Sequence, residues 1–193
     1  EVSPARPVQA ADVAAQLLPS GPAYPFGNAG ETVNSLIHLA QHRLVLTTPY
    51  FVPDDATMSA LRIAALSGVD VQLVLSATNN KRLLLLAQQS YYEELLEAGV
   101  RIALYQPHFM HAKHLSVDDS VALVSSINLD IRSFALNAEI GLLCYDARVV
   151  ARMHEIEADY LLHSEMLSLD QWRRRPSWRR SLEGLSRLAD SFM

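Results

Sequence analysis

The residues best suited to chemistry lie in one short segment, residues 111–128, which reads HAKHLSVDDSVALVSSIN. A histidine can act as nucleophile or base, a lysine supplies a fixed positive charge, and hydroxyl and amide groups hydrogen-bond to phosphoryl oxygens. The segment holds one or more of each of these types: His111, Lys113, Ser126 and Asn128. Their spacing predicts a phosphate site, provided that folding brings the four side chains together.

A β-hairpin would do so. Residues 113–117 and 121–125 are rich in Val, Leu and Ser, and the turn-forming residues 118–120 separate them. If the turn is centred between its last two residues, His111 lies opposite Asn128 and Lys113 lies opposite Ser126. All four groups then meet at the open end of the hairpin.

Strand alternation assigns the side chains to faces. Successive residues point to opposite faces, so His111 and Lys113 are predicted to share one face while Ala112, His114 and Asp118 take the other. We therefore expect Asp118 to have a structural role, as a hairpin cap or in an ion pair, in preference to contacting His111 directly.

Glu139 is the predicted partner of His111. It opens an apolar run, residues 138–145, that reads as a strand beside the hairpin. A carboxylate that holds one ring nitrogen of a histidine fixes its tautomer and leaves the other nitrogen free to attack phosphorus.

The spacing of His108, His111 and His114 invites comparison with a metal site. On a strand, however, His111 faces away from the other two, and the single cysteine leaves no Cys pair to complete a tetrahedral set. We predict that no metal binds here.

Elsewhere, helical and strand patterns alternate, which indicates α/β architecture. Helical spacing covers residues 30–42, 55–67, 79–99 and 146–163, and buried strands are predicted at residues 43–49, 69–75 and 100–105. The expected fold is a mixed, mostly parallel sheet flanked by helices.

Composition divides the chain into three parts. Five of the nine prolines lie in the first 25 residues, so residues 1–16 read as a lead-in or interdomain linker. Residues 17–168 form the predicted domain, and residues 169–193 form a basic tail. Within it, residues 171–193 carry net charge +4, which leaves −9 on residues 1–170 of a chain whose total is −5.

The pattern His111-x-Lys113-x4-Asp118-x6-Ser125-Ser126-x-Asn128 resembles the HKD signature of the phospholipase D superfamily, in which glycine usually stands where this chain has Ser125. The resemblance narrows to bacterial cardiolipin synthases, specifically their second catalytic half, and runs from about residue 17 to the end. The stretches that carry it are residues 48–75, 89–107, 128–140 and 171–180.

The resemblance implies a phospholipase D-like fold and phosphatidyl transfer between two phosphatidylglycerol molecules, giving cardiolipin and glycerol without a metal or organic cofactor. It implies that one histidine forms a phosphohistidine while a histidine of a second HKD half, in the same longer chain or in a homodimer mate, handles the protons. His111 is open to either role. Lys113 and Asn128 are expected to stabilise phosphoryl charge, Ser126 to assist, and Asp118 joins the catalytic signature.

Two further residues are assigned to substrate binding. Tyr50 follows a strand and is expected to line a headgroup or acyl pocket, with core packing as the alternative. Arg132 is expected to contact phosphate, with an ion pair as the alternative.

The tail combines Trp172 and Trp178 with five arginines between residues 173 and 180. Arginines attract anionic headgroups and tryptophan prefers the membrane interface. We expect a contact with the anionic surface of a bacterial cell membrane, the segment itself being peripheral and the longer protein anchored by amino-terminal helices, as the family implies. The alternative is a solvated basic helix packed on the domain.

Two other function classes remain. A phospholipase D-type phosphodiesterase or nuclease acting as a homodimer would use the same motif, but the net charge of −9 over residues 1–170 disfavours a nucleic-acid partner. A non-catalytic half that only completes a partner would be expected to carry a broken motif, and this one is intact apart from Ser125.

Overall fold

An eight-stranded sheet forms the centre of the molecule in a computed structural model that describes residues 13–24, 28–79 and 81–176. In spatial order the strands are β1 (Ala15–Ser20), β9 (Glu139–Cys144), β7 (Val121–Ser125), β6 (His114–Val117), β2 (Arg43–Thr48), β4 (Asp70–Ser76), β5 (Arg101–Tyr105) and β10 (Ser164–Met166). A second, two-stranded sheet pairs β3 (Phe51–Val52) with β8 (Leu129–Asp130).

The sheet is mixed, as expected, but the prediction that it is mostly parallel is wrong. Only the pairs β2–β4 and β4–β5 are parallel, and the other neighbours in the large sheet are antiparallel. Parallel pairs need a crossover helix, and such helices lie only between β2 and β5. The chain enters β6 without a crossover helix, so β6 pairs with β2 in the opposite direction.

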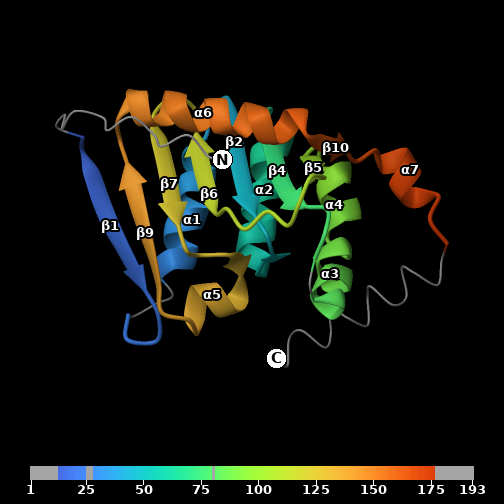
Figure 1. Cartoon of the computed structure of the whole chain (residues 1–193), viewed down its shortest axis with the longest axis horizontal. Helices are drawn as coiled ribbons and strands as arrows, with labels where there is room; N and C mark the ends of the chain where they lie inside the picture. The colour runs from blue at the N-terminus through green and yellow to red at the C-terminus, as the bar shows by residue number, and fades with distance from the viewer. Residues whose placement is uncertain (1–12, 25–27, 80, 177–193) are drawn as a thin grey trace.

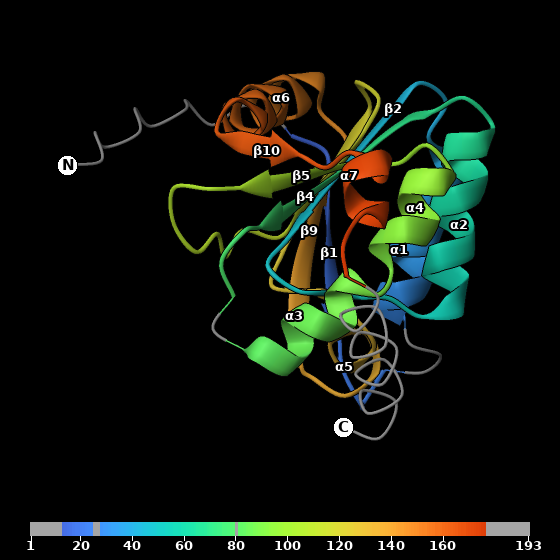
Figure 2. The same cartoon turned by 90° about the vertical axis from the view of Figure 1, so that its right-hand side faces the viewer.

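Helices cover both faces of the sheet (Figures 1 and 2). On one face lie α1 (Asn28–Leu39), α2 (Asp55–Leu66) and α4 (Tyr92–Glu97), and on the other lies α6 (Ala147–Leu162). The main core lies under the first group and contains fully buried Ile37, Leu61 and Leu95. Val150 and Met153 of α6 pack against Ala122 on the opposite face.

The long helix predicted over residues 79–99 is two helices, α3 (Arg82–Gln89) and α4, with a break at Ser90 and Tyr91. The break lets the buried amide of Gln88 donate to the Tyr92 hydroxyl while its carbonyl oxygen accepts from the Phe51 backbone N–H. This ties α3 to β3, the short strand beside the site.

The short helix α7 (Leu169–Arg173) packs on α4. Trp172 is buried, with its ring 5.1 Å from that of Tyr92, and Arg173 pairs with Glu93 and Glu97. The membrane contact predicted for Trp172 is therefore wrong, because its side chain packs against α4 and is buried within the domain. Trp178 and the rest of the tail lie outside the described residues.

Candidate active site

The predicted hairpin is present, but its register differs from the prediction by one residue. Val117 pairs with Val121, and the Ser125 N–H donates to the carbonyl oxygen of Lys113 over 3.0 Å. Lys113 therefore lies opposite Ser125, and the predicted pairing with Ser126 is wrong. The cause is the three-residue turn, in which Asp118 adopts a positive φ of 46°. Ser126 instead pairs with Ile140 beyond the start of β9.

His111 and Lys113 share a face, as strand alternation predicted, although both precede β6. The Lys113 ammonium lies 3.3 Å from Nδ1 and 3.2 Å from Nε2 of His111, and it donates to the His111 carbonyl oxygen over 3.0 Å. Lys113 is buried, whereas His111 is exposed. The pair thus presents an accessible imidazole directly above a fixed cation.

Electrostatics keeps the imidazole neutral. Partial burial, and secondly the charge of Lys113, lower the pKa of His111. Burial also lowers the pKa of Lys113, while the carboxylates of Glu139 and Asp130 oppose that change. A neutral histidine retains a ring lone pair, so at neutral pH the ring can attack phosphorus or accept a proton.

Glu139, at the start of β9, organises the hydroxyl groups of the site. Its Oε2 accepts from the Ser126 hydroxyl over 2.5 Å, and its Oε1 accepts from the Ser133 hydroxyl over 3.3 Å. The Asn128 amide donates to the same Ser133 oxygen over 3.1 Å. Ser126 is thereby joined to Glu139 directly, and Asn128 is joined to it through Ser133.

The predicted contact between Glu139 and His111 is not formed among the described residues, where the side chain of His111 meets Lys113 and the ring of Phe109, 5.8 Å away. The carboxylate instead accepts hydrogen bonds from the hydroxyls of Ser126 and Ser133. Glu139 nevertheless belongs to the same group of polar side chains, because its charge acts on Lys113 and it accepts hydrogen bonds from the two serines. We call this group the constellation; its members are His111, Lys113, Ser126, Asn128, Ser133 and Glu139.

Asp118 lies at the other end of β6, away from the constellation. Its carboxylate accepts from the backbone N–H groups of Gln41, His42 and Arg43 over 2.8 to 3.0 Å. These bonds lower its pKa against the opposing effect of burial. The structure therefore gives Asp118 the structural role that its turn position indicated, and does not bring it into the catalytic group that the signature implied.

A cavity of about 720 Å³ adjoins the constellation. The parallel pair β3–β8 contributes to its lining: Tyr50 precedes β3 and Val52 ends it, while Asn128 precedes β8 and Asp130 ends it. Three residues predicted to act on substrate, Tyr50, Asn128 and Arg132, line this cavity. His111, Lys113, Ser126 and Glu139 lie beside it and do not form its walls. The amide oxygen of Asn128 is buried without a hydrogen-bond partner.

Asp130 is a member of the site that we did not predict. It lines the cavity, its charge acts on Lys113, and its side chain caps α5 (Ile131–Ala135) by accepting from the Ser133 N–H over 2.7 Å. Burial raises the pKa of Asp130. The sequence does carry a cue to its capping role, because aspartate is among the residues preferred at a helix N-cap.

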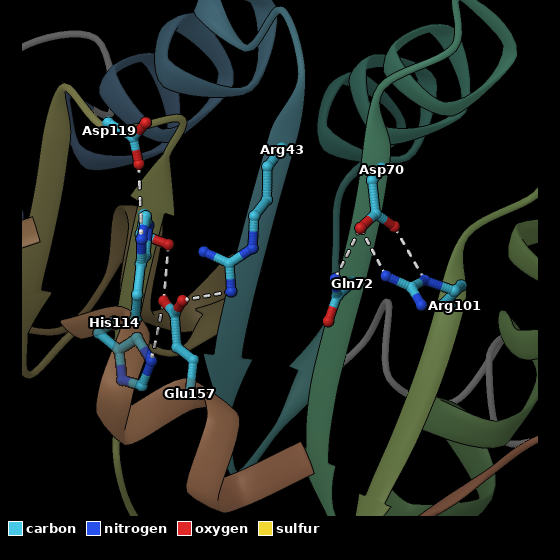
Figure 3. Close-up of polar contacts among 9 residues, drawn as sticks. Arg43, Asp70, Gln72, Arg101, His114, Asp119 and Glu157 are labelled. Atoms are coloured by element: carbon cyan, nitrogen blue, oxygen red, sulfur yellow. Dashed lines mark hydrogen bonds and ion pairs between the residues drawn. The ribbon is translucent and has the colours of Figure 1, made fainter. Parts of the chain in front are cut away.

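His114 points to the opposite face, as predicted, and joins a buried cluster under α6 (Figure 3). Its Nε2 lies 3.6 Å from Glu157, whose carboxylate also accepts from Ser116 over 2.6 Å and pairs with Arg43 over 2.9 Å. Burial lowers the pKa of His114 to about 4. Burial likewise raises the pKa of Glu157, which is 0% exposed.

In the part of the chain that the structure describes, no three His, Cys, Asp or Glu residues cluster as metal ligands would. Nor does any helix among residues 13–24, 28–79 and 81–176 combine the length and apolar character needed to cross a membrane.

Comparison with known proteins places this site in a family. Residues 33–159 match the family model described as the phospholipase D-like domain of cardiolipin synthase. The chain is 36% identical over 170 residues to cardiolipin synthase A of Serratia proteamaculans, and 37% identical over the same length to that of Pectobacterium carotovorum. Each match covers 88% of this chain and 35% of the relative, so the chain spans about a third of these proteins.

Solved structures share the fold at lower identity. A phosphatidylserine synthase of Haemophilus influenzae superposes with a TM-score of 0.76 at 20% identity, over 93% of this chain and 47% of that one. Nuc of Salmonella typhimurium, a phospholipase D family member, gives a TM-score of 0.67 at 21% identity, over 81% of this chain and 99% of that one.

The fold and the His111–Lys113 pair are those of a phospholipase D-like domain. Within that class, the chain belongs to the cardiolipin synthase family.

Proposed function

We propose that this chain is one catalytic half of a phosphatidyltransferase that makes cardiolipin and glycerol from two phosphatidylglycerol molecules. The observation that carries the proposal is the contact between the exposed His111 ring and the buried Lys113 ammonium, beside a cavity large enough for a phospholipid headgroup. Membership of the cardiolipin synthase family supports a phospholipid substrate. The net charge of −9 over residues 1–170 favours a lipid phosphodiester over a nucleic acid.

The chemistry takes two displacements at phosphorus. In the first, a histidine nitrogen forms a bond to phosphorus as the bond to the glycerol oxygen breaks, and a second histidine gives that oxygen a proton. In the second displacement, the histidine that gave up its proton removes a proton from the hydroxyl of another phosphatidylglycerol. That oxygen attacks phosphorus, the phosphorus–nitrogen bond breaks, and cardiolipin leaves.

The neighbours of His111 stabilise the charge that develops. The Lys113 ammonium lies where it can bind a non-bridging phosphoryl oxygen. The Asn128 amide lines the cavity and can donate a hydrogen bond to another phosphoryl oxygen. Glu139 keeps the Ser126 hydroxyl oriented and opposes the effect of burial on Lys113, which helps to keep that lysine charged.

A second HKD half is required because one histidine cannot be both nucleophile and proton donor on opposite sides of phosphorus. His114 cannot serve, since it is buried under α6 on the other face. The relatives are about three times as long as the matched region, which leaves room for such a half. The alternative source is a second copy of this chain. The site of action that we propose is the bacterial cell membrane.

Substitutions at the pair test the proposal. Introduced into a full-length protein that carries both HKD halves, His111→Ala and Lys113→Ala should each reduce cardiolipin formation from phosphatidylglycerol in detergent micelles to less than a few per cent, with unchanged circular dichroism. Glu139→Gln should reduce cardiolipin formation less, because the glutamine side chain retains an oxygen that can accept a hydrogen bond from a serine hydroxyl. The matched control is His38→Ala, which alters an exposed histidine on α1 and should retain full activity. Substantial activity in folded His111→Ala would refute the proposal.

A further inference from the structure

Two short helices form the rim of the cavity, and both expose large apolar side chains. Leu83 of α3 is 61% exposed, Ile131 of α5 is 44% exposed, and Leu136, directly after α5, is 57% exposed. The two helices lie at the same end of the molecule in both views (Figures 1 and 2). Exposing these three apolar side chains to water around one opening does not stabilise the fold, and such a group of exposed apolar residues is typical of an interaction site.

Cationic side chains alternate with the apolar ones on the same rim. Lys81, Arg82 and Arg132 line the cavity, whereas Asp130 is the single acidic residue among its described walls. The Lys81 ammonium lies 5.2 Å from the centre of the ring of Tyr50, which also lines the cavity. The rim thus has local positive charge in a chain whose total is −5.

Apolar side chains set among cations match the chemistry of an anionic bilayer surface, where the former enter the acyl boundary and the latter bind headgroup phosphates. A buried protein–protein interface would instead be depleted in charge at its centre. The cavity opens between these residues, so a bilayer seated on the rim would face the site directly.

We propose that Leu83, Ile131 and Leu136, with Lys81, Arg82 and Arg132, form a membrane-contact rim that seats the domain on an anionic phospholipid bilayer. Its role in admitting a phospholipid headgroup to the cavity rests on the proposed function, whereas its binding to a bilayer does not. The rim takes the place of the contact that the sequence indicated for Trp172, which is buried.

Vesicle flotation tests the rim without turnover. The purified chain should float with vesicles of phosphatidylglycerol and phosphatidylcholine but not with phosphatidylcholine alone. Leu83→Glu combined with Leu136→Glu should weaken binding at least about tenfold, because it removes two inserted groups and adds repulsion. Lys81→Gln with Arg82→Gln should weaken binding and reduce its dependence on salt.

Matched controls keep the test specific. Leu66→Glu and Leu162→Glu alter residues that are 69% and 80% exposed on α2 and α6, away from the cavity, and should leave binding unchanged. His111→Ala should bind vesicles like the wild type, so a failure of the catalytic proposal would not affect this result. Undiminished binding by the folded Leu83→Glu/Leu136→Glu variant, equal loss in the controls, or no preference for phosphatidylglycerol would overturn the inference.

Discussion

Replacing Arg43 by methionine should destabilise the domain by about 3 kcal/mol, because it leaves the carboxylate of Glu157 buried without its cation (Figure 3). Breaking a buried ion pair by removing one partner costs about 3–5 kcal/mol. We expect the lower end, since the Arg43 side chain is 27% exposed and burial already raises the pKa of Glu157, so that the orphaned carboxyl group can take up a proton.

The partner variant should behave differently. Glu157→Gln removes the buried charge but keeps an oxygen that accepts from Ser116, so it should cost only about 1 kcal/mol. The double variant Arg43→Met/Glu157→Gln should therefore be more stable than Arg43→Met alone. This ordering is the distinctive result, because independent contributions would make the double variant the least stable.

Urea unfolding followed by circular dichroism at pH 7 measures these free energies. The matched control is Arg101→Met, which breaks a surface pair with Asp70 whose side chains are 51% and 43% exposed, and it should cost less than about 1 kcal/mol (Figure 3). An Arg43→Met variant no less stable than the control, or a double variant less stable than both single variants, would refute the reasoning.

Three more outcomes follow from the same contacts. The pKa of His114 is lowered to about 4, against about 6.5 unfolded, so its contribution to stability is complete above pH 6.5 and lost as pH falls to about 4. The stability advantage of wild type over His114→Gln should shrink by about 3 kcal/mol across that window in urea titrations, and a constant difference would contradict this. Asp118→Ala removes the acceptor of three backbone N–H groups and should cost about 2 kcal/mol, while the folded variant keeps its turnover; a specific loss of turnover would return Asp118 to the chemistry. EDTA should leave cardiolipin formation unchanged, and loss of activity that one added metal restores would overturn the two-histidine mechanism.

Local patterns predicted the main helices, the inner strands of the sheet and the faces of His111, Lys113 and His114, because alternation and turn chemistry are properties of neighbouring residues. His111 and Lys113 share a face, and His114 points away, as two-residue periodicity requires. The exact register was beyond this reasoning, because it depends on the positive φ of Asp118, which three backbone donors from residues 41–43 hold in place.

Long-range pairing decided the rest. The edge strands β1 and β10 carry little local strand pattern, since β1 includes Pro19 and β10 is the three-residue SEM, and both form by antiparallel pairing with β9 and β5. In the same way, Glu139 was placed beside the hairpin correctly, but its bonds to Ser126 and Ser133 depend on how α5 packs.

The central claim is that this chain supplies only one of the two catalytic histidines. The most direct test is to measure turnover of the 193-residue chain as a function of protein concentration, with sedimentation velocity on the same samples. Monomeric chain should be nearly inactive on phosphatidylglycerol, and activity should appear only with a homodimer or on addition of a second HKD half, since His111 supplies one side of the phosphorus. Full specific activity in a sample shown to be monomeric would contradict this, because both catalytic groups would then lie within one copy of this chain.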